Sequence, residues 1–205
     1  MSRNVLSRCA FSILGTALLA APVVFAATAA EPSPVTLLLQ FEEKRSDVML
    51  DAMKQELSTI MKDSGYRFDY RLAEDAGSGD VYPELVIVKF KGRCTMDRIP
   101  LPFDERGPFG FTHTVDGEVL PFSVIACERV KSSITPVLTA NEHKDADAVF
   151  GRAVGRVLAH ELFHIMAKTD KHGTKGVAKP ALSAGQLVSN QLEMDRSDLE
   201  RLHHR

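Results

Sequence analysis

The chain has 205 residues, of which 44% are apolar, and its formal net charge at pH 7 is −2. This length and composition are typical of one globular domain that can bury a hydrophobic core. The nearly balanced charge gives no reason to expect a nucleic acid or an anionic surface as a partner.

Residues 1–29 have the layout of a secretory signal peptide. Arg3 and Arg8 precede an apolar run, and Ala27-Thr28-Ala29 forms an A-x-A cleavage site. We therefore expect a mature chain of residues 30–205 that is a single domain, secreted or periplasmic. Because nothing like a stop-transfer segment follows, we expect no membrane anchor after cleavage, and we expect a monomer. Loss of the two arginines would take the net charge from −2 to about −4.

The next part of the chain predicts three strands and one helix. An unbroken apolar run over 35–41 predicts a buried strand. Apolar residues near helical spacing over 44–62 predict a helix. An alternating pattern over 66–72 and an apolar run over 84–90 predict two further strands. The order strand, helix, strand, strand predicts an α/β-like N-terminal half with a mixed sheet.

A hairpin and a disulfide are predicted in the middle of the chain. Strand-like segments 109–114 and 119–127 flank Asp116-Gly117, a dipeptide that favours a tight turn. Cys94 and Cys127 remain after removal of the signal peptide, and an even pair in an exported protein favours a disulfide. Zinc ligation by these cysteines is the alternative, but they lack C-x-x-C spacing. The sequence pattern of segment 129–143 is ambiguous and predicts no secondary structure for it.

The main chemical signal is the motif H-E-x-x-H at 160–164. The apolar residues before it recur at three- and four-residue steps, which predicts an amphipathic helix: Val149, Phe150, Ala153, Val154, Val157 and Leu158. Residues four apart share one helix face, so His160 and His164 can converge on one ion while Glu161 lies on the neighbouring flank. Gly151 and Gly155 are interpreted as allowing close approach to a packed neighbour. The alternative is a core helix that carries two satisfied histidines.

A catalytic zinc site needs a third protein ligand and leaves a fourth position for water. We prefer His172 as this ligand, because imidazole suits zinc and Gly173 can supply a turn. Asp170 remains the alternative.

Short patterns also predict helix starts. Thr139 to Glu142 fits a capping box ahead of the long helix, with Asp145 as a rival cap. Ser183 to Gln186 makes a second box, and Met194 fits a hydrophobic staple before a last short helix.

The segment from about Gly151 to the C-terminus resembles the zincin metallopeptidases of metzincin-like type. It is also similar to small secreted bacterial proteins with H-E-x-x-H and a third His eight residues after the motif. The resemblance implies an α+β, zincin-like fold: a mixed twisted sheet, an active-site helix carrying the motif, and short C-terminal helices. Three positions depart from the metzincin pattern. Ala167 replaces a Gly, Asp170 stands where that pattern has its third His, and Ala178 stands where a turn Met is expected.

The resemblance implies a secreted zinc metalloendopeptidase. His160, His164 and His172 would hold Zn²⁺, and Glu161 would be the catalytic base that takes a proton from the attacking water. The substrate would be a peptide or protein that adds as a strand to segment 109–114 at the sheet edge; a hairpin without a ligand is the alternative there. Three alternative hypotheses remain: a catalytically inactive, secreted zincin-fold binding protein, a metal-storage or sensing domain, and an enzyme acting on a non-peptide amide. Candidates for stabilising the oxyanion are Tyr66, Tyr70, Tyr82 and His113.

Overall fold

The computed structural model describes residues 34–97 and 107–203, and the structural statements below refer to these residues. The predicted signal peptide at 1–29 lies outside them. The predicted start of the mature chain at 30 lies outside them as well.

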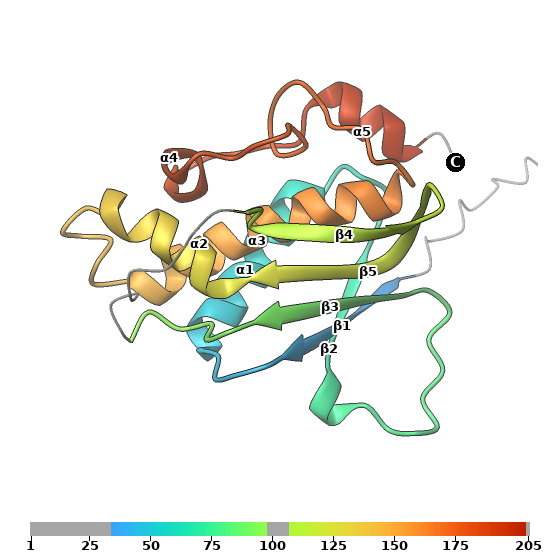
Figure 1. Ribbon diagram of the computed structural model, residues 1–205, viewed down its shortest axis with the longest axis horizontal. Coiled ribbons are helices and arrows are strands. Elements are labelled where there is room, and N and C mark those ends of the chain that lie inside the picture. Colours follow the sequence, from blue (N-terminus) through green and yellow to red (C-terminus); the bar gives the residue numbers. More distant parts are fainter. Residues whose placement is uncertain (1–33, 98–106, 204–205) are drawn as a thin grey trace, which may run out of the picture. The chain divides into compact units, whose positions relative to one another are not determined.

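A five-stranded mixed sheet forms the centre of the fold (Figure 1). The strand order is β2-β1-β3-β5-β4, and the first three pairs in this order are parallel while β4 runs antiparallel to β5. The strands span Val35–Phe41 (β1), Phe68–Leu72 (β2), Leu85–Lys91 (β3), Gly110–Val115 (β4) and Glu118–Ala126 (β5). The sequence therefore predicted the mixed sheet and its strands correctly.

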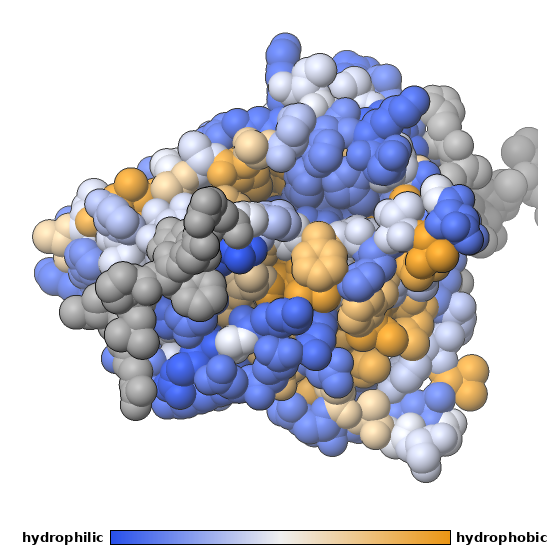
Figure 2. All heavy atoms as spheres, viewed as in Figure 1, coloured by the Kyte–Doolittle hydropathy of each residue, from blue (hydrophilic) through white to orange (hydrophobic). Residues whose placement is uncertain are grey.

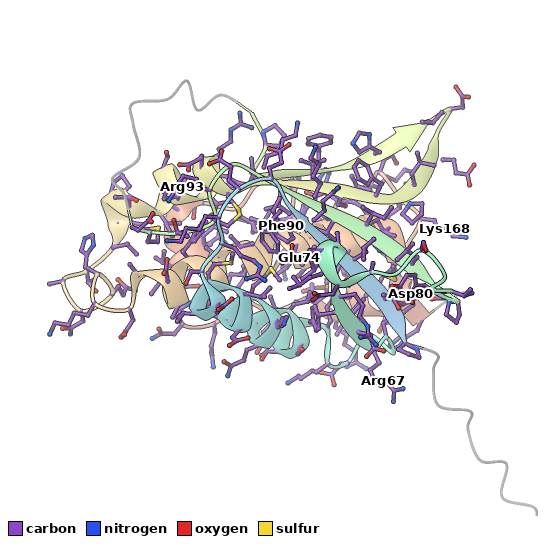
Figure 3. The ribbon with its side chains drawn as sticks, turned by 90° about the horizontal axis from the view of Figure 1, so that it is seen from below. Arg67, Glu74, Asp80, Phe90, Arg93 and Lys168 are labelled. Carbon is purple, nitrogen blue, oxygen red and sulfur yellow. A yellow bond between two sulfur atoms is a disulfide. The ribbon has the colours of Figure 1, made fainter. Side chains whose placement is uncertain are left out.

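Two long helices, α1 (Asp47–Met61) and α3 (Ala146–Met166), cover one face of the sheet (Figure 1). Phe90 of β3 is fully buried in the layer of side chains between sheet and helices (Figure 3). On the other face, Leu38, Ile87 and Phe122 are direct cross-strand neighbours and only half-buried. Figure 2 shows apolar side chains gathered on this side of the molecule.

The two long helices approach each other closely at two glycines. A Cβ atom at Gly151 would collide with the carbonyl oxygen of Met49, and one at Gly155 would lie 2.8 Å from the carbonyl oxygen of Met53. The interpretation of these glycines as contact points is therefore confirmed. The approach fixes α3, and with it the H-E-x-x-H motif, against α1.

Three shorter helices complete the described part of the chain: α2 (Cys127–Ile134) follows β5, and α4 (Ala184–Val188) and α5 (Arg196–His203) follow α3. The ambiguous segment 129–143 thus holds most of α2 and a 3₁₀ turn at Thr135–Val137. A second 3₁₀ turn lies at Ala73–Asp75. Within the described ranges, no helix combines the length and apolar character that crossing a bilayer would require.

The predicted hairpin turn and disulfide are both present. Asp116 and Gly117 have φ angles of 51° and 82°, as a tight hairpin turn with two left-handed central residues requires. Cys94 and Cys127 form a disulfide with a Cα–Cα distance of 5.2 Å. It ties the segment after β3 to the first residue of α2.

The caps agree with the sequence in part. Ser183 and Gln186 form the predicted capping box at α4. The Thr139–Glu142 hydrogen bonds also form, but they close a turn before the helix, because α3 begins at Ala146 with Asp145 as its N-cap. The prediction of Thr139 as the cap of the long helix is therefore wrong. The rival Asp145 is at the N-cap position, although its side chain makes no capping hydrogen bond.

Candidate metal centre

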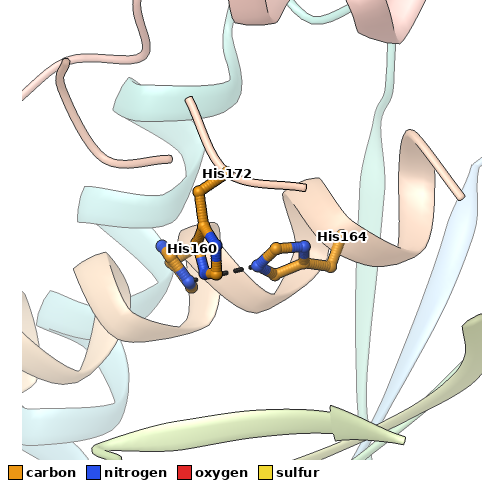
Figure 4. Close-up of side chains that lie close together, drawn as sticks. All are labelled: His160, His164 and His172. Carbon is orange, nitrogen blue, oxygen red and sulfur yellow. Dashed lines mark hydrogen bonds between the residues drawn. The ribbon is translucent and has the colours of Figure 1, made fainter. Parts of the chain in front are cut away.

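Three histidines converge at the C-terminal end of α3 (Figure 4). His160 and His164 project from successive turns of the helix, and His172 reaches them from the loop that follows it. Their candidate ligand atoms all lie within 4.8 Å of one another. The Nε2 atoms of His160 and His164 are 3.2 Å apart. The cluster contains His172 and not Asp170.

The chain turns back toward the helix at Lys168. This residue has a φ of 44°, and its amide donates to the carbonyl oxygen of Ile165. A left-handed conformation usually favours glycine. The metzincin pattern has its Gly at position 167, so the turn comes one residue later here. His172 then reaches the cluster from the loop that follows this turn.

Backbone carbonyls fix the orientation of the two helical imidazoles. His160 Nδ1 lies 2.9 Å from the carbonyl oxygen of Val177, and His164 Nδ1 lies 2.7 Å from that of Thr169. A carbonyl oxygen can only accept, so each Nδ1 carries the proton and each Nε2 presents a lone pair. The sequence did not predict this role of Val177, because the contact is made by a backbone carbonyl, which every residue type carries.

Burial keeps both imidazoles neutral. It lowers the pKa of His160 to about 4, and the Val177 carbonyl opposes this only in part. Burial also lowers the pKa of His164, again against an opposing backbone hydrogen bond. At neutral pH the Nε2 atoms of His160 and His164 therefore both lack a proton, and their lone pairs are free to bind a cation. A set of neutral nitrogen donors arranged in this way fits a bound cation such as zinc.

Glu161 is buried beside the histidines, with 4% of its surface exposed. The hydroxyl of Thr112 on β4 donates to its Oε2 at 2.7 Å, and the hydroxyl of Ser123 lies 2.8 Å from that of Thr112. Burial raises the pKa of Glu161 to about 7, although the Thr112 hydrogen bond lowers it. A Cβ atom at Gly110 would lie 2.9 Å from Oε1, so a glycine lets β4 pass close to this carboxylate.

A cleft of about 340 Å³ runs between β4 and the histidine cluster. The three histidines and Glu161 line it together with Gly110 and other residues of β4. A smaller pocket of about 180 Å³ shares His160 and Glu161 and has a mainly apolar wall that includes Val157 and Leu182. A larger groove of about 590 Å³ elsewhere contains none of the candidate site residues.

The candidates for oxyanion stabilisation do not line this cleft. The hydroxyl of Tyr70 donates to the carbonyl oxygen of Lys54, and that of Tyr82 donates to Asp80. His113 packs against Phe122, with ring centroids 4.6 Å apart. Tyr66 packs near Phe68 instead, with ring centroids 6.5 Å apart.

No family model matches the chain, and no curated protein matches it. Among solved structures, the chain is similar to the crystal structure of archaemetzincin from Methanopyrus kandleri. The TM-score is 0.50 with 14% sequence identity, and the match covers 85% of this chain and 97% of the other. At this identity the likeness concerns the fold. The chain is thus a mixed α/β protein whose fold is similar to that of archaemetzincin.

Proposed function

We propose that the protein is an exported zinc metallopeptidase in which His160, His164 and His172 hold the metal and Glu161 is the general base. The observation that carries the proposal is the convergence of three imidazoles: Nε2 of His160 and Nε2 of His164 are 3.2 Å apart, and the candidate ligand atoms of all three histidines lie within 4.8 Å of one another. The name of the structural neighbour supports it, since archaemetzincin is named for the metzincins, the type that the sequence motif resembles.

Three protein ligands suit a catalytic zinc because they leave a coordination position open. Bound zinc would polarise a substrate carbonyl and lower the pKa of a water at that position. His172 is exposed and lines the cleft, so substrate could reach the centre from there. Second-sphere carbonyls from Val177 and Thr169 would keep the helical imidazoles aimed at the metal.

Glu161 has the properties of a proton carrier at this position. In the metal-free protein burial raises the pKa of Glu161 to about 7, and a carboxylate at this place can accept a proton from an attacking water and release it again to a leaving amine. Thr112 holds Oε2, while Oε1 accepts no hydrogen bond from any residue in the described ranges. We infer that Oε1 is the oxygen that exchanges the proton.

The substrate would be a peptide or protein segment in extended form. β4 is an edge strand and forms one wall of the cleft, so a peptide can add to it through main-chain hydrogen bonds. Export rests on the pattern of residues 1–29. The Cys94–Cys127 disulfide supports export, because such bonds persist mainly in oxidising compartments.

The experiment combines metal analysis with a peptide-library assay on four proteins: wild type, Glu161→Gln, His172→Ala and the control His143→Ala, whose histidine is exposed outside the cluster. Wild type and control should bind one zinc and cleave peptides. Glu161→Gln should keep zinc and lose roughly 100- to 10,000-fold in rate. His172→Ala should bind zinc weakly. Zinc binding without any cleavage by wild type would contradict the peptidase proposal and favour a secreted binding protein.

A further inference from the structure

The C-terminal helix α5 contacts the loop that carries His172 on both sides of that residue. On one side, Arg201 Nη2 donates to the carbonyl oxygen of Lys171 at 3.1 Å and to the hydroxyl of Thr169 at 3.4 Å. Thr169 is also the residue whose carbonyl accepts from His164 Nδ1. One guanidinium is thus bonded to the loop at two points just before His172.

On the other side of His172, α5 packs so close to Gly173 that no larger residue would fit there. A Cβ atom at Gly173 would collide with Oδ2 of Asp198. This carboxylate is almost fully buried, with 1% of the residue exposed, and its Oδ2 has no hydrogen-bond partner among the described residues. The carboxylate therefore limits how far the loop can move toward α5.

Arg201 is itself held in place by two contacts. Its Nη1 donates to Asp198 Oδ1 at 3.1 Å. Its guanidinium carbon lies 4.7 Å from the centroid of the Phe163 ring, which is fully buried in α3 immediately before His164. A planar guanidinium can stack on a ring and donate to several acceptors at once, whereas an ammonium group cannot reproduce this geometry.

His172 makes no hydrogen bond within residues 34–97 and 107–203, and its ring packs only against the rings of His160 and His164. Its two partners in the cluster are both oriented through Nδ1 by a backbone carbonyl. His172 is the exposed member of the three and comes from a loop rather than from the helix.

We propose that α5, through Arg201 and Asp198, sets the position of His172 for metal binding, with Arg201 as a positioning residue. The proposal rests on the metal site proposed above. It extends that site to a helix that begins 24 residues after His172 and does not enter the cleft. Removal of the Arg201 side chain should weaken metal binding by freeing the third imidazole.

The test measures zinc affinity by chelator competition for Arg201→Met and for Arg196→Met, a matched control on the same helix whose side chain is 92% exposed. Arg201→Met should weaken binding roughly 10- to 100-fold, as loss of an orienting partner does at other metal sites. It should also change the visible spectrum of the cobalt-loaded protein, while the control should leave both readouts unchanged. Should Arg201→Met fail to fold, Arg201→Lys keeps the charge and most of the stem but not the planar group, and allows the same comparison.

A double-mutant cycle with His172→Ala separates positioning from a general loss of structure. If Arg201 acts through His172, Arg201→Met should not weaken binding further once His172 is alanine. An equal loss in both backgrounds, or no loss in either, overturns the proposal. The failure of the metal site itself looks different, because wild type would then bind no zinc or His172→Ala would bind as tightly as wild type.

Discussion

Replacement of Glu161 by glutamine should stabilise the metal-free protein, mainly at neutral to alkaline pH. The folded protein raises the pKa of this carboxyl from its ordinary value of 4.5 to about 7, chiefly by burial. An acid with a raised folded pKa contributes stability below its unfolded pKa and loses it as the pH rises through the folded pKa. The difference between the unfolded and folded pKa values of Glu161 corresponds to roughly 3 kcal/mol in the free energy of unfolding.

Glutamine has nearly the same shape, can still accept the Thr112 hydrogen bond and does not ionise. The Glu161→Gln variant should therefore be more stable than wild type by roughly 3 kcal/mol at pH 8, and by less than about 1 kcal/mol at pH 5. The lowered pKa of His160 also makes stability depend on pH, but this dependence is common to both proteins and cancels in the difference.

The assay is urea unfolding of the chelator-treated proteins at both pH values, with Glu43→Gln as the control for an exposed glutamate. The control should match wild type at each pH. Equal stability of wild type and Glu161→Gln at pH 8, or a gain that persists undiminished at pH 5, would refute the reasoning from burial. If Glu161→Gln is more stable at pH 8 but inactive, a group that is needed for activity lowers the stability of the folded protein.

The remaining predictions concern β4, the helix contact and the disulfide. Thr112→Val removes the hydroxyl that holds the Glu161 carboxylate, and the rate of peptide cleavage should fall by roughly 10-fold or more. Thr112→Ser should keep most of the wild-type rate, and equal rates for the valine and serine variants would contradict this prediction. Gly151→Ala forces a Cβ against the backbone of α1 and should destabilise the protein by roughly 2 kcal/mol or more, whereas Gly79→Ala meets nothing within 4 Å and should be near neutral in the same urea assay. Replacing Cys94 and Cys127 by alanine should lower the unfolding free energy by roughly 3–4 kcal/mol, and an unchanged value would show that the crosslink adds no stability.

Local patterns in the sequence account for most of the fold and for the three histidines. The period of the apolar residues predicts α3, and the four-residue spacing then fixes the relation of His160 to His164. His172 follows from its distance to the motif and from the preference of zinc for imidazole. Each of these inferences uses residues that lie close together along the chain.

The supporting contacts could not be predicted because they join distant segments. Thr112 and Glu161 are 49 residues apart, and the bond exists only because β4 packs beside α3. The bond from Arg201 to Lys171 spans 30 residues and depends on how α5 folds back. An arginine in a polar C-terminal helix is indistinguishable in sequence from a solvated surface charge, as its helix neighbour Arg196 shows.

The most direct test of the proposed centre is a crystal structure of the zinc-loaded protein with anomalous scattering measured at the zinc absorption edge. We predict one strong peak with a nitrogen of His160, His164 and His172 each at about 2.0–2.1 Å from it. A peak that is ligated by Asp170 in place of His172, or the absence of any peak between the two helical imidazoles, would contradict the account.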